Sequence, residues 1–189
     1  ANLDLHFFSE NTLRFLLAKN AAGCDVSVIE GAMGFYDGAG LTTWKTSAYE
    51  LALVTKTPVV LVVNARGAAL SVLAVIEGFL RFRPESGIRG VILNQCTAMT
   101  YASLSAAIEE RFGIRCFGFL PRLDECVLES RHLGLVTAGE IRDLREKMQT
   151  LAAQAEKTLD IDALLAPKPP VRRELGGFVL RDVRVLLHS

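Results

Sequence analysis

Three short runs of apolar, mostly β-branched residues constrain the fold of this 189-residue chain more than any other feature. They span residues 26–29, 58–63 and 90–93, and a weaker run spans residues 116–120. None of them alternates apolar with polar residues, which is typical of strands that a parallel sheet buries on both faces. The pattern therefore predicts a mostly parallel sheet whose strands include residues 25–30, 58–63, 90–94 and 115–119.

Helical patterns separate these runs. The expected helices span residues 11–22, 71–82, 101–112 and 137–159, and Gly113 follows the third one where a C-cap glycine would lie. Alternating strands and helices form right-handed βαβ units. We therefore expect an α/β, doubly wound sheet with helices on both faces. The inner face of the last helix is expected to carry Ile141, Leu144, Met148, Leu151, Ala152 and Ala155.

A proline-rich stretch at residues 166–170 is typical of a linker. We therefore expect one domain over residues 1–165 and a linker and tail over residues 166–189. The apolar run Val183–Leu187 in the tail is either an extra strand or the start of a following segment.

Composition excludes several classes of protein. Lys plus Arg and Asp plus Glu are 21 each, and this balance argues against a nucleic-acid binder. No apolar run is long enough for a transmembrane helix, and residues 1–6 do not resemble a signal peptide. The four cysteines are spread singly, so we expect no zinc site and reduced thiols in a cytoplasmic protein.

The segment of residues 28–38 is the richest in chemistry. A buried strand ends at the carboxylate of Glu30, and a loop with Gly31, Gly34 and Gly38 follows. Ligands bind at the carboxyl ends of strands in open α/β sheets, and a carboxylate there can hold the Mg²⁺ of a nucleotide. The alternative is that Glu30 caps a neighbouring helix and the glycines serve a turn. Asp37 is a candidate second carboxylate of the same site.

A nucleotide site also needs a phosphate cradle, which is normally GxxxxGK[ST] after the first strand. The chain contains no such motif. This is the main difficulty for interpreting the chain as an ATPase, and we expect the isolated chain to bind ATP weakly or not at all.

The glycine loop at residues 30–38 resembles the EGxMGxYDG signature of the cobyrinic acid a,c-diamide synthase family. Other motifs of that family follow in order over about residues 2–165. Residues 47–53 resemble its serine-led helix, and residues 58–67, 90–94, 118–122 and 129–135 resemble its PVVLVVDARG, GVILN, G-x-LPR and PERHLGL motifs. The resemblance implies a P-loop NTPase fold like that of the dethiobiotin synthetases.

The departures from the family are also informative. Asn64 stands where the family usually has aspartate, so no carboxylate can act there. Ser130 follows Glu129 where the family has Pro-Glu before Arg-His, which is a minor change. Residues 2–4 resemble an NLD motif that lies well after the family's first strand and P-loop. The resemblance therefore implies the distal part of the ATP-dependent synthetase domain, without the P-loop and without the glutaminase domain.

The resemblance also implies roles for individual residues. Glu30 would hold Mg²⁺ and act in catalysis with Asp37, which would orient the reacting carboxylate. Asn94 would read the adenine edge, and Pro121 and Arg122 would line the base pocket. The corrinoid substrate would contact Asp4, Tyr36 and Ser47, although Tyr36 could instead simply cover the loop.

The implied reaction uses ATP to phosphorylate the c- and then the a-carboxylate of cobyrinic acid. Ammonia that the glutaminase domain releases from glutamine would then form each amide. The implied partners are the corrinoid, ATP and the glutaminase domain, with a homodimer possible and no nucleic acid or membrane. The alternatives are a dethiobiotin-synthetase-like or partition-ATPase-like protein and a non-catalytic interaction domain.

Overall fold

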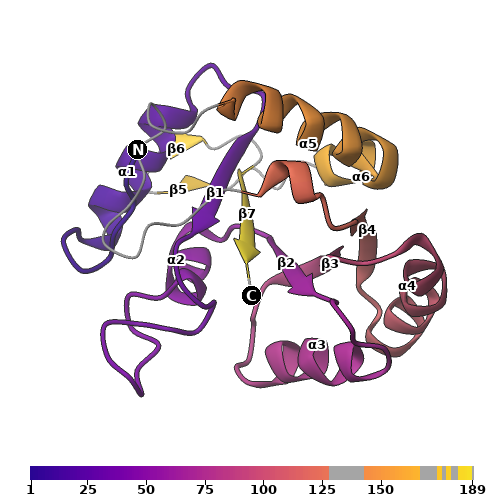
Figure 1. The fold of residues 1–189 in the computed structure, drawn as a ribbon. Coiled ribbons are helices and arrows are strands. Elements are labelled where there is room, and N and C mark those ends of the chain that lie inside the picture. Colours follow the sequence, from indigo (N-terminus) through magenta and orange to yellow (C-terminus); the bar gives the residue numbers. More distant parts are fainter. Residues whose placement is uncertain (128–142, 167–173, 176–177, 180–182, 189) are drawn as a thin grey trace.

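The computed structural model of the chain describes residues 1–127, 143–166, 174–175, 178–179 and 183–188 (Figure 1). Its helices are α1 Glu10–Ala21, α2 Ala48–Thr55, α3 Ser71–Arg81, α4 Ala98–Phe112, the 3₁₀ turn η1 Asp124–Cys126, α5 Leu144–Thr158 and α6 Ile161–Leu165. Its strands are β1 Ser27–Gly31, β2 Val59–Asn64, β3 Ile88–Asn94, β4 Arg115–Leu120, β5 Glu174–Leu175, β6 Phe178–Val179 and β7 Val183–His188.

The main sheet has five strands in the order β1-β7-β2-β3-β4, and neighbouring strands pair in parallel throughout. The short strands β5 and β6 form a separate antiparallel pair. The carboxyl ends of the parallel strands meet at one edge of the sheet. This confirms the predicted parallel sheet and determines where its ligands can bind.

Successive residues of the central strands enter two different hydrophobic cores, as the alternation of side chains along a strand requires. Leu61 and Val91 are fully buried in the core that α2, α3 and α4 cover. Val60, Ile92 and Phe117 face the opposite core, against the end of α5 and α6. In Figure 1, α2 and α3 lie below the sheet, and α5 and α6 lie above it. The doubly wound α/β fold with helices on both faces is confirmed.

Local signals in the sequence set the helix ends. The side chains of Ser9, Ser47 and Thr97 each accept a backbone N–H of the first turn of α1, α2 and α4. Such caps satisfy amide groups that have no partner inside the helix. Gly113 ends α4 in the left-handed conformation (φ 63°), as predicted.

The last long helix differs from its prediction. The predicted helix began at residue 137, but residues 137–142, with Ile141, lie outside the described residues, and α5 starts at Leu144. Its predicted inner face is wrong in part, because Met148 is 46% exposed and no residue of α5 is fully buried. The helix packs on β4 and η1 at the border of the sheet, so only a narrow stripe of it is covered.

The tail contributes a strand to the main sheet. β7 pairs in parallel with β1, where Ser27 aligns with Val183, and with β2, where Val59 aligns with Val185. The apolar run at residues 183–187 is therefore a strand, and it joins β1 to the rest of the sheet. The division at residue 166 into a domain and a tail stays a prediction.

No helix within the described ranges is long and apolar enough to cross a membrane. The four cysteines are free thiols; Cys96 and Cys116 are buried in the core, whereas Cys24 is exposed. Burial raises the pKa of the Cys116 thiol to about 11, so this thiol is protonated at neutral pH.

Gly118 of β4 provides a test of the packing between β4 and α5. Its φ is +128°, and a Cβ there would overlap the backbone oxygen of Thr158. We expect Gly118→Ala to lower the free energy of unfolding by about 2 kcal/mol or more, because both the backbone strain and the clash oppose it. Urea denaturation measures this change.

The matched control is Gly78→Ala in α3, where an added Cβ meets nothing within 4 Å. There the same substitution is expected to stabilise the helix by about 0.5–1 kcal/mol. Equal effects of the two substitutions would contradict the packing of β4 against α5.

Candidate functional site

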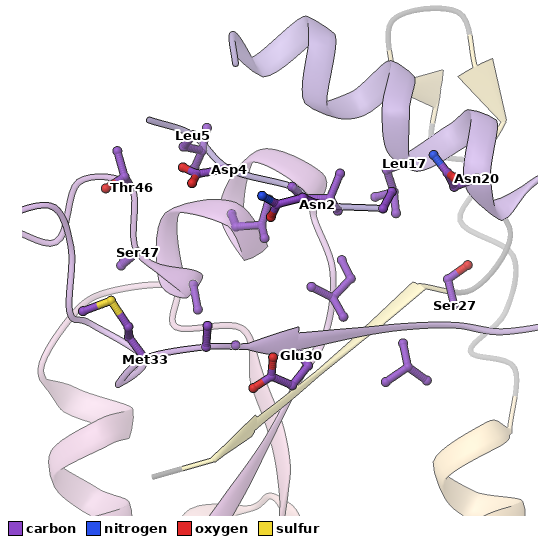
Figure 2. Close-up of a pocket in the computed structure, with 18 of the residues that line it drawn as sticks. Asn2, Asp4, Leu5, Leu17, Asn20, Ser27, Glu30, Met33, Thr46 and Ser47 are labelled. Carbon is purple, nitrogen blue, oxygen red and sulfur yellow. The ribbon is translucent and has the colours of Figure 1, made fainter. Parts of the chain in front are cut away.

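A cavity of the described residues lies beside β1 and the glycine loop that follows it (Figure 2). We call it the carboxylate cavity. Its volume is about 680 Å³, and its walls come from the N-terminal segment, α1, β1, the glycine loop and the start of α2. Four of the predicted site residues line it: Asp4, Glu30, Asp37 and Ser47. The structure therefore brings together residues that are up to 43 positions apart in the sequence.

Backbone geometry holds the Asp37 carboxylate close to Gly34. The Asp37 N–H donates to the Gly34 oxygen at 2.9 Å. A Cβ on Gly34 would overlap Asp37 Oδ2, so no larger residue fits there without moving the carboxylate. Glu30, the fourth residue of β1, and Asp37 are both exposed to solvent. The carboxylates are thus available to a ligand in the cavity.

Ser47 is the N-cap of α2 and is only 2% exposed. Its Oγ accepts the Glu50 N–H at 3.3 Å, and Glu50 Oε2 in turn accepts the Thr46 N–H at 2.5 Å. This reciprocal arrangement resembles a capping box, in which Ser and Glu satisfy the free amides of a first helical turn. The hydroxyl of Ser47 therefore has a structural partner, and its contact with substrate stays a prediction.

Asp4 lies across the carboxylate cavity from Glu30, on the N-terminal segment (Figure 2). Its Oδ1 accepts the His6 N–H at 2.8 Å, which fixes the turn that leads into α1. The described residues contain no group of three His, Cys, Asp or Glu side chains that could hold a metal ion. Mg²⁺ bound to phosphates often needs only one or two carboxylates, because waters and the phosphates complete its shell. The exposed carboxylate of Glu30 could supply such a ligand.

Tyr36 does not line the carboxylate cavity. Its ring packs among Tyr49, Phe79 and Phe82, and its hydroxyl donates to the Phe79 oxygen at 2.5 Å. Burial raises the pKa of Tyr36 to about 12, with a further rise from Tyr49 that Arg83 partly opposes. These contacts tie the glycine loop to α3, and a role in substrate binding stays a prediction.

The second cavity lies at the carboxyl ends of β2, β3 and β4, and we call it the Asn94 cavity. Its volume is about 340 Å³. All three predicted nucleotide-binding residues line it: Asn94, Pro121 and Arg122. Sequence reasoning did not select its other polar residues, Arg66 and Gln95. Gln95 directly follows the predicted strand 90–94, and Arg66 lies three residues after the predicted strand 58–63, so their positions near strand ends were the available signal.

A hydrogen bond to the next residue orients the Asn94 side chain. Its Oδ1 accepts the Gln95 N–H at 3.0 Å, and Gln95 has a left-handed backbone conformation (φ 53°) that allows this turn. The amide nitrogen at the other end of the side chain is a donor. Arg122 forms an ion pair with Asp124, with Nε and Oδ1 2.5 Å apart. The cavity therefore combines an oriented amide, an apolar proline and a paired cation.

The sequence is similar to known proteins over most of its length. Residues 9–130 match the family described as AAA domain. The chain is 41% identical over 187 residues to a cobyrinate a,c-diamide synthase of Caldanaerobacter subterraneus, covering 97% of this chain and 41% of the relative. Synthases of the same name from Listeria monocytogenes and Thermoplasma acidophilum are 38% and 40% identical, over 87% and 77% of this chain and 37% and 32% of their own lengths. The chain thus spans less than half of the length of these relatives.

The raised pKa of Tyr36 predicts a pH dependence of stability. Its folded value of about 12 exceeds the ordinary value of 10.0, so the folded state favours the protonated hydroxyl. This contribution is fully present below pH 10 and is lost as the pH rises from 10 towards 12. We expect Tyr36→Phe to cost about 1 kcal/mol at pH 8, the worth of one hydrogen bond, and the difference from the unsubstituted chain to reach zero between pH 10 and pH 12.

Urea denaturation of both proteins at several alkaline pH values measures the difference. A difference that stays constant from pH 8 to pH 12 would show that the pKa of Tyr36 is the same in the folded and the unfolded chain. Such a result would contradict the hydrogen bond to Phe79.

Proposed function

The chain belongs to the AAA domain family and to the family of the cobyrinate a,c-diamide synthases, and we propose that it forms the ATP- and substrate-binding part of a glutamine-dependent amidoligase. The proposed substrates are ATP and the a- and c-carboxylates of cobyrinic acid. The proposed source of ammonia is a glutaminase domain. The names of the relatives favour a corrinoid over the substrate of a dethiobiotin synthetase.

One observation carries this proposal. Asn94, Pro121 and Arg122 come from the ends of two strands and line a single cavity at the edge of the sheet where ligands of such folds bind. The carboxyl end of β1, with Glu30, belongs to the same edge. The adenine base would occupy the Asn94 cavity, and the phosphates would extend towards Glu30.

The proposed reaction has two steps for each carboxylate. A carboxylate oxygen of the substrate attacks the γ-phosphorus of ATP, which gives an acyl phosphate and ADP. Ammonia then attacks the acyl carbon, and inorganic phosphate leaves with the bonding electron pair to yield the amide. The barrier of the first step is mainly electrostatic, since an anion must approach the charged triphosphate.

The residues of the chain would divide this work. Glu30 would hold Mg²⁺, which offsets negative charge on the transferring phosphoryl group. Asp37, held by Gly34, would orient the substrate around the reacting carboxylate. Asp4 lies on the facing wall of the same cavity and would contact the corrinoid from the other side. We place Asn94 on the adenine edge because its amide can donate and accept hydrogen bonds.

Asn94→Asp tests the base site. The aspartate keeps an oxygen for the Gln95 N–H but loses the amide donor, so adenosine affinity should fall at least about tenfold, which is about 1.4 kcal/mol. NMR titration of the chain with adenosine, which carries no phosphate, measures this weak binding. The chain lacks a GxxxxGK[ST] motif, so we expect binding of ATP to be weak as well.

Asn64→Asp is the matched control. Asn64 aligns with Asn94 in the sheet and likewise accepts a backbone N–H, from Arg66 at 3.0 Å, but it does not line the cavity. This variant should bind adenosine as the unsubstituted chain does. Equal losses in the two variants would remove Asn94 from the base site.

Glu30→Gln tests the metal role. The variant keeps the size of the side chain and removes the charge, so amidation should fall at least about a hundredfold, the scale of one lost electrostatic stabiliser. The assay is formation of cobyrinic acid a,c-diamide from cobyrinic acid, ATP and glutamine. The enzyme is the Caldanaerobacter relative with its matching segment replaced by this chain.

Asp37→Asn should also impair amidation in that enzyme. Glu110→Gln, an exposed carboxylate of α4, removes the same charge far from both cavities and should change little, as should Cys96→Ala. Near-normal turnover of the Glu30→Gln enzyme would exclude the proposed metal role. An unsubstituted chimera that folds and amidates no corrinoid would contradict the proposed substrate.

A further inference from the structure

Arg66 occupies a distinctive position in the Asn94 cavity. It follows β2, whereas Asn94 ends β3 and Pro121 follows β4. The sheet order β1-β7-β2-β3-β4 therefore puts Arg66 on the side of the cavity that is nearer to β1 and Glu30. Two hydrogen bonds fix the backbone there: the Ala65 N–H donates to the Asn94 oxygen at 2.8 Å, and the Arg66 N–H donates to Asn64 Oδ1 at 3.0 Å.

The two arginines of the cavity differ in their partners. Arg122 forms an ion pair with Asp124, which offsets its charge. The Arg66 guanidinium is exposed and forms no ion pair or hydrogen bond with a side chain in the part of the chain that the structure describes. An exposed guanidinium presents several N–H donors in a planar fork that matches phosphate oxygens. Among the described residues that line the cavity, the uncompensated positive charge therefore lies at the β2 side.

The spacing of β3 and β1 in the sheet is similar to the length of a nucleotide. From β3 to β1 there are three steps between neighbouring strands, which is about 14 Å at ~4.8 Å per step. An extended nucleoside triphosphate has a similar length. A nucleotide with its base beside Asn94 and its last phosphate near Glu30 must carry its phosphates past the end of β2.

From this placement and charge we infer that Arg66 binds the phosphate groups of a nucleotide whose base lies in the Asn94 cavity. Arg66 would then select nucleotides over nucleosides at this site and orient the phosphate chain towards Glu30. This inference rests on the proposed nucleotide site and adds a phosphate-binding residue to it.

The test compares how the chain with and without the Arg66 charge binds nucleosides and nucleotides. NMR titrations of the chain with adenosine, AMP and ATP give the three affinities, for the unsubstituted chain and for Arg66→Gln. We expect Arg66→Gln to weaken ATP binding about tenfold and to leave adenosine binding within twofold. The ATP affinity of the unsubstituted chain should also fall with added salt more steeply than that of the variant.

Arg89→Gln is the matched control, because Arg89 is an exposed arginine at the opposite end of β3. It should bind adenosine and ATP as the unsubstituted chain does. An equal loss of ATP affinity in Arg89→Gln would mean that only net charge matters and would overturn the assignment of Arg66.

The remaining outcomes separate this inference from the proposal beneath it. Unchanged ATP affinity in Arg66→Gln would overturn the inference and leave the base site intact. Equal losses for adenosine and ATP would mean that Arg66 supports the base rather than the phosphates, which also overturns it. An unsubstituted chain that binds neither ligand would contradict the nucleotide site itself, and the role of Arg66 would fall with it.

Discussion

Parallel hydrogen bonding at the carboxyl ends of β2, β3 and β4 holds the candidate nucleotide site together. Asn94 aligns with Asn64 on one side and with Leu120 on the other. The bonding continues beyond the strands, because the Ala65 N–H donates to Asn94 and the Cys96 N–H donates to the Leu120 oxygen at 3.0 Å. Backbone pairing thereby fixes the relative positions of three loops whose side chains line one cavity. Displacement of any one strand end would open that cavity.

β7 has a comparable role for the whole edge of the sheet. It separates β1 from β2, with Gly31 aligned to Leu187 and Val62 aligned to His188. The position of the carboxylate cavity relative to the Asn94 cavity therefore depends on this one strand from the tail. The proposed reaction between a nucleotide and a carboxylate substrate requires that spacing.

Much of the fold could be predicted from the sequence, because strands buried on both faces and amphipathic helices leave clear patterns. The grouping of Asn94, Pro121 and Arg122 was also predictable from the family resemblance. Three features were not. The insertion of β7 depends on long-range pairing, and the exposure of Met148 depends on how little of α5 the sheet covers. Arg66 could be recognised as a phosphate-binding candidate only from the sheet order and from the ion pair that offsets the charge of Arg122.

The central claim is that one nucleotide spans the carboxyl edge of the sheet, with its base at Asn94 and its phosphates directed to Glu30. Backbone amide NMR of the labelled chain with Mn²⁺ and ATP tests this most directly, since the paramagnetic ion broadens nearby resonances. We expect shifts at residues 94–95 and 120–123 from the base and selective broadening at Glu30 and Gly31. Broadening centred on residues 94–95 and 120–123, with Glu30 and Gly31 unaffected, would contradict the claim.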